Sequence, residues 1–331
     1  MKPSATPLPL LLGVSLLAVA CSPAPQPDPG AAGDTAPTEA TPITLRYFGT
    51  AGWEISAPGH TSADLSADVP ADPVVVLVDP DRTRATYGSN RSWDPEDDRP
   101  AYTRHDTLFS DSELIDATIE GADYILVQHS HPDHVMDVPY LAHKTGAVVI
   151  GHESTINIMR AYGVPNDQLI TVRGGEDYDF GDVSVRVIES LHSPLNDKRY
   201  YQSDVVPEDV TRPLRINQHV EGGSHMFLVR IGGQEVQTMG SMNYIEREVE
   251  GLRPDVALVG AAPSHLEIFQ YTPKLMKALG YPATVIPTHA DNFQAPWGSP
   301  IAYRTEWVEA FAEEVREASP ESRVIIPRHL E

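Results

Sequence analysis

The sequence His-Ser-His-Pro-Asp-His at residues 129–134 constrains this chain more than any other segment. It follows the apolar run 124–127 after a single residue, Gln128. If that run is a strand, His129 and His131 leave the sheet edge on the same side, because alternate residues share a face. Neutral imidazole nitrogen and carboxylate oxygen are the ligands that zinc and its neighbours prefer. The spacing therefore predicts a metal site, and the alternative is a histidine-rich surface turn.

The same segment resembles the His-x-His-x-Asp-His motif of the metallo-β-lactamase superfamily, and other parts of the chain extend this resemblance. Asp79 ends the apolar run 75–78, His192 follows the run 187–191, and His289 follows the run 285–288. The resemblance covers residue 43 to the C-terminus. It implies an α/β fold of the αββα four-layer sandwich type. Taken singly, His192 or His289 could equally be a buried, hydrogen-bonded histidine.

The resemblance also implies a pair of adjacent metal ions. We expect zinc, with iron or manganese as alternatives, and a hydroxide shared between the ions as the nucleophile, because coordination lowers the pKa of water from 15.7 to about 7. Asp79 is expected to orient a ligand through a hydrogen bond, or else to cap the turn before Pro80. The implied ligands of the first ion are His129, His131 and His192, and those of the second are Asp133, which also belongs to the catalytic centre, His134 and His289.

One departure from the family pattern concerns the aspartate that bridges both ions in most relatives. The equivalent stretch here is Gly240-Ser241-Met242, so Ser241 replaces the bridging residue. A neutral hydroxyl is a poor bridge, although some β-lactamases of the superfamily also have serine there. The expected centre is one unit more positive than with a bridging aspartate. It should therefore accept an anionic oxygen readily and hold its second ion less tightly.

Two long polar segments without sustained periodicity, 81–109 and 193–222, are expected to be loops. Loops of this length in compact domains are usually functional or disordered, and the second directly follows His192 and is placed to line the site. Weaker candidates for a substrate pocket lie near positions that face the cleft in relatives. They are Asn196, His225, His265, Tyr271 and Asn292.

Hydrophobic patterns predict most of the secondary structure. Residues 44–48 and 53–55 read as a hairpin and 74–78 as a strand. Ser110 and Glu113 have the spacing of a capping box at the start of a short helix, and a helix is expected near 136–144. Paired strands are expected at 226–231 and 235–239, a helix at 305–318 and a last strand at 323–326. Strands first and then alternating strands and helices in each half favour two helix-covered sheets.

The N-terminus reads as an export signal. The apolar run 10–20 is shorter than the roughly 20 residues that span a bilayer, and it fits a signal peptide over residues 1–20. Small residues before Cys21, the only cysteine, resemble a bacterial lipobox; an ordinary signal peptide is the alternative. Residues 21–42 would be a lipidated Pro/Ala-rich tether and residues 43–331 the hydrolase domain. We expect outer-membrane attachment facing the periplasm through the N-terminal lipid.

The charge balance bears on partners. The chain has 24 Lys and Arg against 47 Asp and Glu, and a formal net charge of -23. Such a surface repels polyphosphate, so no nucleic-acid partner is expected. The partner expected instead is a small-molecule substrate, possibly anionic.

The function predicted from these observations is metal-dependent hydrolysis of an ester, lactone or phosphodiester. The opening hairpin, the segment ending at Asp79 and the metal loop most resemble the branch with ascorbate-phosphate lactonase and the N-acyl-phosphatidylethanolamine phospholipases. A β-lactam hydrolase is the alternative within the superfamily. The alternative from another class is a non-catalytic surface lipoprotein that binds metal or ligand.

Overall fold

The computed structural model describes residues 41–59, 72–87, 94–195, 197–303 and 305–330, which form two large mixed sheets and one small sheet. The first large sheet has the order β1 (Thr44–Gly49), β2 (Gly52–Ala57), β3 (Val74–Val78), β6 (Tyr124–Val127), β7 (Val148–Gly151) and β8 (Leu169–Thr171). The second has the order β15 (Arg323–Val324), β14 (Thr284–Thr288), β13 (Val256–Gly260), β12 (Gln234–Met239), β11 (His225–Ile231), β10 (Val183–Glu189) and β9 (Asp177–Asp179). The small sheet pairs β4 (Thr86–Tyr87) with β5 (Ala101–Tyr102).

Strand direction decides which loops meet. In the first sheet β3, β6 and β7 run parallel. In the second sheet β12, β13 and β14 run parallel, and β10 shares their direction because β11 is antiparallel to both β10 and β12. The segments that follow the carboxyl ends of parallel strands lie at one edge of a sheet, where ligands bind in open α/β sheets. The segments after β3, β6, β10, β12 and β14 hold Asp79, the six expected ligands and Ser241, whereas His225 lies on β11 and His265 and Tyr271 follow β13.

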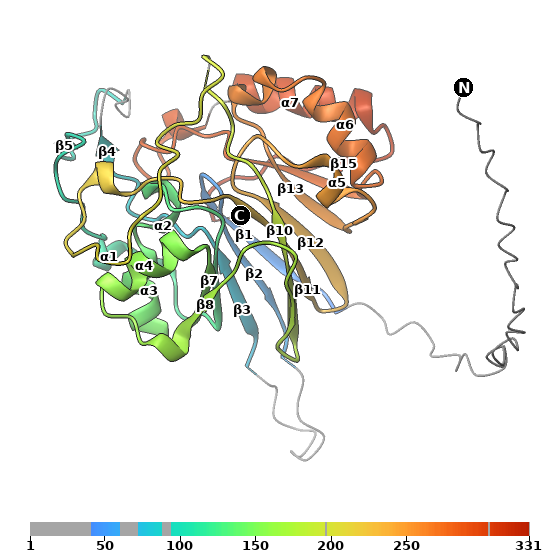
Figure 1. Ribbon diagram of the computed structural model, residues 1–331. Coiled ribbons are helices and arrows are strands. Elements are labelled where there is room, and N and C mark those ends of the chain that lie inside the picture. Colours follow the sequence, from blue (N-terminus) through green and yellow to red (C-terminus); the bar gives the residue numbers. More distant parts are fainter. Residues whose placement is uncertain (1–40, 60–71, 88–93, 196, 304, 331) are drawn as a thin grey trace, which may run out of the picture. The chain divides into compact units, whose positions relative to one another are not determined.

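The two sheets pack face to face and each has helices on its outer face (Figure 1). Trp53, Leu126 and Phe227 belong to the apolar core between the sheets. A second apolar core lies between the first sheet and the helices that cover it. A third lies between the second sheet and the helices on its own outer face. The helices are α1 (Ser112–Thr118), α3 (Val138–Thr145) and α4 (Glu153–Ala161) on the first sheet, and α5 (Glu246–Val249), α6 (Tyr271–Ala278) and α7 (Thr305–Ala318) on the second. This arrangement confirms the αββα sandwich.

Several predicted boundaries were wrong for identifiable reasons. The cap of α1 is Asp111, whose carboxylate accepts the Leu114 N–H at 3.0 Å, and not Ser110. The helix expected near 136–144 is α3, which begins two residues later than expected and follows a separate short helix, α2 (Pro132–Val135). Pro139 lies in the first turn of α3, where its missing N–H costs no hydrogen bond. The short strands β8 and β9 were not predicted, and β15 ends two residues earlier than expected.

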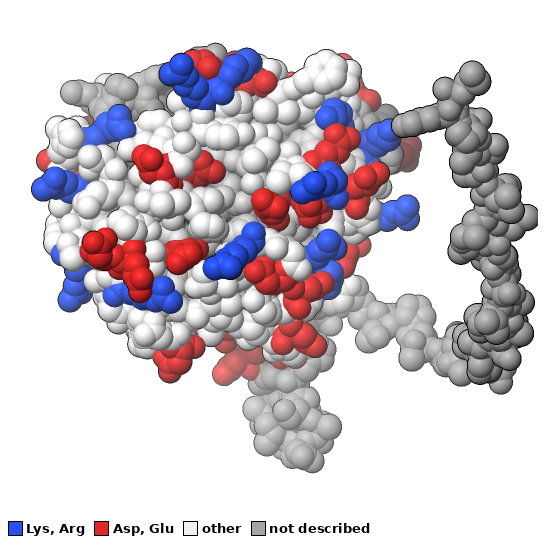
Figure 2. Space-filling model, viewed as in Figure 1, with Lys and Arg blue, Asp and Glu red and all other residues white. Residues whose placement is uncertain are grey.

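The described residues from Thr41 onward belong to one compact unit. Within them no helix has both the length and the apolar content needed to cross a bilayer. The predicted signal peptide at 1–20, the lipidation site Cys21 and most of the tether at 21–42 lie outside the described residues. On the face drawn in Figure 2, acidic and basic side chains of the described residues are interspersed.

The inter-sheet core predicts a large difference between two phenylalanine positions. Phe227 is 0% exposed, whereas Phe109 is 71% exposed. Phe227→Ala should lower the free energy of unfolding by about 3–5 kcal/mol, because it leaves a cavity in packed apolar surroundings. Phe109→Ala should change it by less than about 0.5 kcal/mol. Urea unfolding of both variants measures the difference, and equal midpoints would show that the sheets do not pack as described.

Candidate metal centre

The structure brings all six expected ligand side chains to the same edge of the two sheets, in two groups. In each group the candidate ligand atoms lie within 4.8 Å of one another. The first group comes from the loop after β6 and the segment after β10, and the second adds the residue that follows β14. The first group is His129, His131 and His192, and the second is Asp133, His134 and His289.

The first group is a tripod of imidazoles. The ring centroids of His129 and His131 are 4.8 Å apart, those of His129 and His192 are 4.9 Å apart, and those of His131 and His192 are 4.8 Å apart. The three pairs of ring planes cross at 87°, 82° and 90°. Rings in this arrangement can direct one nitrogen each toward a common point, as three-histidine zinc sites require.

Hydrogen bonds decide which nitrogen of each ring is left for a ligand bond. Nε2 of His131 lies 3.1 Å from the Tyr201 carbonyl oxygen, so its Nδ1 is the remaining donor atom. Nδ1 of His192 lies 2.8 Å from the Ser193 carbonyl oxygen, so its Nε2 remains. Nε2 of His129 is buried and has no hydrogen-bond partner among the described residues. Metal-binding histidines typically donate the other ring N–H to a carbonyl or carboxylate, and His131 and His192 each have such a carbonyl partner.

The second group converges on one carboxylate oxygen. Oδ2 of Asp133 lies 3.5 Å from Nε2 of His134 and 3.6 Å from Nε2 of His289. Nε2 of His134 is also buried and has no hydrogen-bond partner among the described residues. A buried polar atom left unpaired is costly, so these two orphaned nitrogens indicate a missing partner. A divalent cation fits the donor set in both groups.

Asp79 makes the hydrogen bond that fixes His134. Its carboxylate is fully buried, and Oδ2 accepts the Nδ1–H of His134 at 2.7 Å. Gln128 donates its backbone N–H to Oδ1 at 2.8 Å and its side-chain Nε2–H to Oδ2 at 2.9 Å. The Asp79 side chain therefore orients His134, as expected. The turn before Pro80 is closed by the Asp79 backbone carbonyl, which accepts the Asp81 N–H at 2.8 Å, and not by the side chain.

His289 is held in an uncommon backbone conformation by the turn between β1 and β2. Its φ is +53°, in the left-handed region that non-glycine residues rarely adopt. Its N–H donates to the Thr50 carbonyl oxygen at 2.6 Å, and Thr50 N–H donates to Oδ1 of Asp291 at 2.9 Å. Strain of this kind persists where the surroundings over-determine the conformation, and it is typical of functional sites. The opening hairpin thus positions a ligand more than two hundred residues away.

A buried ion pair supports the loop after His289. Arg84 and Asp291 are 2.9 Å apart, and both side chains are almost fully buried. Burial raises the pKa of Asp291, but Arg84 and His329 more than offset it and hold that pKa well below its usual range. Arg84 also donates to the carbonyl oxygen of Asn292 at 2.6 Å. The sequence gives no signal for this contribution, because Arg84 lies in an aperiodic loop.

The histidines have protonation states suited to metal binding. Burial, together with the neighbouring imidazoles, lowers the pKa of His131 to about 3 and lowers the pKa of His129 well below its usual value. Burial lowers the pKa of His192 and His289 as well. Neutral imidazole is the form that binds a metal ion. His134 differs: burial lowers its pKa, but Asp79 and Asp133 outweigh this, so the net shift is upward.

Ser241 lies where the resemblance placed the bridging residue. It lines the same cavity as the ligands, and its Oγ accepts the Ser193 N–H at 2.8 Å. Gly240, which precedes it, allows the two sheet edges to approach, because a Cβ there would meet Cβ of Gln128 at 2.7 Å. The serine hydroxyl is therefore fixed on the wall of the cavity that the candidate ligands line.

Both long loops contribute to the cavity over the candidate ligands, which has a volume of about 400 Å³. Tyr87 and Arg104 come from the segment 81–109, and Leu195 and Tyr201 come from 193–222. The sequence predicts that the segment 193–222, which contains Tyr201, lines the site, but it gives no signal for Tyr87, Arg104 or Leu195, since neither loop has a periodic pattern. Further lining residues outside the ligand groups include Ser193, Met242, Ala262, Ser264, Phe293 and Gln294.

The weaker pocket candidates do not line this cavity. The Tyr271 hydroxyl donates to the Gly260 carbonyl oxygen at 2.8 Å inside the helix-covered core, and His265 pairs with Glu314 at 3.1 Å. His225 is buried on β11 and presents its backbone N–H to Gln128. The Asn292 carbonyl oxygen accepts a hydrogen bond from Arg84, and the next two residues, Phe293 and Gln294, line the cavity. Asn196 lies outside the described residues. Polar residue type alone did not distinguish core positions from cavity positions.

Comparison with known proteins agrees with this geometry. The family profile described as "Beta-lactamase superfamily domain" matches residues 44–289. The chain belongs to this superfamily. Proteins of Staphylococcus aureus described as UPF0173 metal-dependent hydrolases are 34% identical to it over 120 residues, 35% of this chain and 50% of theirs. The chain thus matches about half the length of these curated relatives.

Solved structures show the same fold. Igni18, a metallo hydrolase from the archaeon Ignicoccus hospitalis, is 16% identical, with a TM-score of 0.53 and coverage of 87% of this chain and 96% of that one. CmlA, a diiron β-hydroxylase from Streptomyces venezuelae, is 15% identical, with a TM-score of 0.50 and coverage of 87% and 53%. At these identities the likeness concerns the fold alone.

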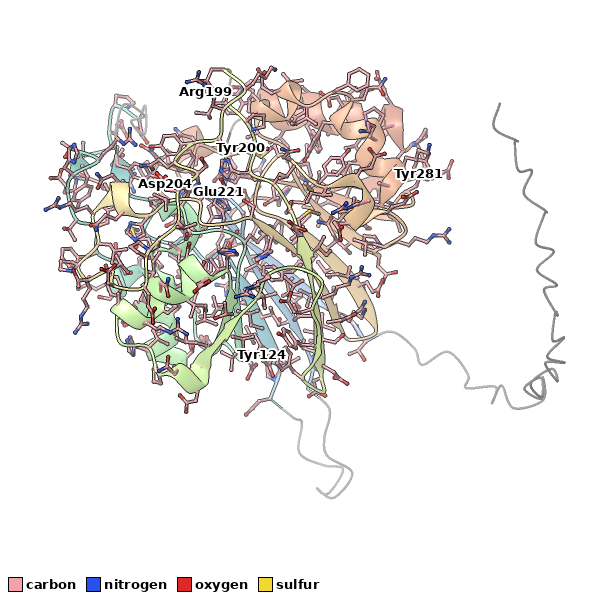
Figure 3. All side chains as sticks on the ribbon, in the orientation of Figure 1. Tyr124, Arg199, Tyr200, Asp204, Glu221 and Tyr281 are labelled. Carbon is pink, nitrogen blue, oxygen red and sulfur yellow. The ribbon has the colours of Figure 1, made fainter. Side chains whose placement is uncertain are left out.

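The hydrogen bond from His134 to Asp79 predicts a loss of metal affinity in Asp79→Asn. An amide cannot supply two carboxylate oxygens to Gln128 and His134 at once, so zinc affinity should fall about 10- to 100-fold. Asp123→Asn is the matched control, because Asp123 precedes Tyr124 at the remote end of β6, which Figure 3 shows. Competition with a chromophoric chelator measures both affinities. Equal affinity in the two variants would contradict the orienting role.

Proposed function

We propose that this protein is a hydrolase that holds two divalent metal ions, zinc in the first instance, and acts on an ester, lactone or phosphodiester. The observation that supports it is the meeting of six candidate ligands in two adjacent groups with unpartnered Nε2 atoms on His129 and His134. A buried cluster of this kind without a cation would leave desolvated polar atoms unpaired.

The ligand groups differ in their preference for metals. The tripod of His129, His131 and His192 matches three-histidine zinc sites. The group of Asp133, His134 and His289 is a set of two imidazoles and one carboxylate, which both zinc and iron(II) accept. When bound, the ions would lower the pKa of coordinated water from 15.7 to about 7 and polarise the substrate oxygen.

Residues of the chain would orient the metal ligands and supply hydrogen-bond donors to the substrate. Asp79 and the carbonyl groups of Ser193 and Tyr201 fix the ring orientations of three ligands, so little reorganisation is needed during the reaction. Ser241 accepts a backbone N–H, which leaves its own O–H to donate into the cavity. Burial and the negative charge of Asp133 raise the pKa of Tyr87 well above its usual value, so its hydroxyl stays protonated and can donate to a substrate oxygen.

Two alternatives predict different results in the same assays. A β-lactam hydrolase would share the serine at position 241, and a non-catalytic binding protein would share the metal groups. The complete set of six ligands argues against a retired site, since a decayed site usually loses several ligands. Attachment to the outer membrane through Cys21, facing the periplasm, is also part of the proposal and rests on residues 1–42 alone.

Metal analysis and turnover test the proposal together. The zinc-loaded full chain should hydrolyse bis-p-nitrophenyl phosphate or a lactone, lose activity with a chelator and regain it with zinc. His131→Ala should lose at least about 100-fold in turnover, because losing a ligand exceeds the effect of losing a residue that only orients one. His143→Ala, on the exposed face of α3, is the control. Turnover of nitrocefin alone would favour the β-lactamase, and bound metal without turnover would favour the binding protein.

Ser241→Asp tests the charge of the centre. A carboxylate there can still accept the Ser193 N–H and adds one negative charge to the cavity that both ligand groups line. The variant should therefore retain the second ion better than wild type at limiting zinc, measured by native mass spectrometry. Ser264→Asp adds the same charge elsewhere in the cavity and is the control. If Ser241→Asp retains no more metal than wild type, the argument from the missing bridge is wrong.

A further inference from the structure

Arg104 brings a positive charge to the cavity that the metal chemistry does not use. It lines the cavity together with the two ligand groups, and its guanidinium carbon lies 5.4 Å from the centroid of the Tyr201 ring. It is the single Lys or Arg among the described residues of the lining. A guanidinium over an aromatic face keeps its N–H donors in a plane that is free to face a ligand.

No carboxylate of the described residues lies within 4.0 Å of this guanidinium. Two other arginines of the same loop are paired with acidic residues, Arg99 with Asp97 at 2.8 Å and Arg84 with Asp291 at 2.9 Å, and buried Arg82 donates to the Thr118 hydroxyl at 3.1 Å. Acidic residues outnumber basic ones by 47 to 24 in this chain. An arginine without an acidic neighbour in so acidic a protein is a candidate for binding an anion from outside.

The backbone around Arg104 is fixed relative to the first ligand group. The Arg104 carbonyl oxygen accepts the Asn217 N–H at 2.9 Å, and Thr107 and Arg215 form an antiparallel bridge. These contacts join the segment 81–109 to the segment 193–222. Tyr201, from the second segment, places its carbonyl oxygen 3.1 Å from Nε2 of His131. A short chain of contacts therefore connects a candidate metal ligand to the arginine.

The other residues that line the cavity indicate the size and polarity of the ligand that would fit it. Leu195, Met242, Ala262 and Phe293 contribute apolar surface to the lining of the cavity. A volume of about 400 Å³ is at the lower end of the range for small-molecule sites. A compact, partly apolar molecule fits this space, with one end at the metal groups and a charged end at Arg104.

We propose that Arg104 is a specificity-determining residue that binds an oxyanion on the substrate, a carboxylate or a phosphate, apart from the bond that is hydrolysed. This inference rests on the proposed hydrolase function and narrows its substrate class to anionic esters or lactones with a small apolar body. Guanidinium binds both oxyanions through paired N–H donors. The missing bridging carboxylate at Ser241 acts in the same direction, because it leaves the neighbouring centre more positive.

The size of the effect follows from exposure. Arg104 is exposed to solvent, so its attraction for an anion is screened by water and salt. An effect of about tenfold is expected, in KM more than in kcat, because the contact is the same in ground state and transition state. The effect should shrink as the salt concentration rises.

A matched pair of substrates tests the proposal in the zinc-loaded full chain. Mono-p-nitrophenyl glutarate has a free carboxylate, and p-nitrophenyl hexanoate is a neutral ester of similar length. In Arg104→Gln the ratio of kcat/KM for the anionic ester to that for the neutral ester should fall about tenfold, mainly through KM. Arg104→Lys should recover part of the ratio, since it keeps the charge but loses the planar fork.

Arg199→Gln is the matched control, because it removes the same charge from the tip of the segment 193–222, where the side chain is 84% exposed (Figure 3). Its ratio should equal that of wild type. An unchanged ratio in Arg104→Gln, or an equal fall in both variants, overturns the proposal.

Binding measurements separate this inference from the proposed function. If zinc-loaded wild type hydrolyses neither ester, calorimetry with glutarate and with n-propyl phosphate still tests the arginine. About tenfold weaker binding of either anion to Arg104→Gln than to Arg199→Gln supports the oxyanion site and identifies which oxyanion it takes. Equal binding of both anions to the two variants overturns it, whatever the outcome for hydrolysis.

Discussion

The shared strand direction within each sheet is the constraint on which the site depends. β3 and β6 run parallel in the first sheet, β10, β12 and β14 share a direction in the second, and the segments that follow these strands meet at one edge of the sandwich. Asp79, the 129–134 loop, His192, Ser241 and His289 are far apart in sequence and adjacent there. The apolar core between the sheets fixes these strand ends relative to one another. The geometry of the site therefore depends on the packing of this core.

The orientation of the imidazole rings depends on hydrogen bonds in addition to the fold. The fold brings the imidazoles together, but hydrogen bonds to Asp79, Ser193 and Tyr201 decide which nitrogen each ring presents. His289 needs more support, since its left-handed backbone is held by Thr50 and the loop beyond it by the Arg84–Asp291 pair. Residues that bind no metal therefore account for much of the precision of the centre.

The sandwich and the positions of the six ligands were predictable because alternation and motif spacing are local signals. The start of α3 was also within reach, since proline is favoured in the first turn of a helix and Pro139 lies there. The roles of Arg84, Tyr87, Arg104 and Tyr201 were not, because they depend on contacts between two aperiodic loops. The candidates His225, His265, Tyr271 and Asn292 were misplaced for a related reason: a buried polar residue with a good internal partner looks the same in sequence as one that faces a cavity.

The most direct measurement is zinc K-edge X-ray absorption on the zinc-loaded full chain, with the bound zinc counted in the same sample. Two ions per chain, imidazole scattering and a metal–metal vector of roughly 3.5–4 Å are expected from two adjacent groups containing five histidines. A single ion with mainly oxygen ligands and no metal–metal vector would contradict a dinuclear centre formed by these side chains.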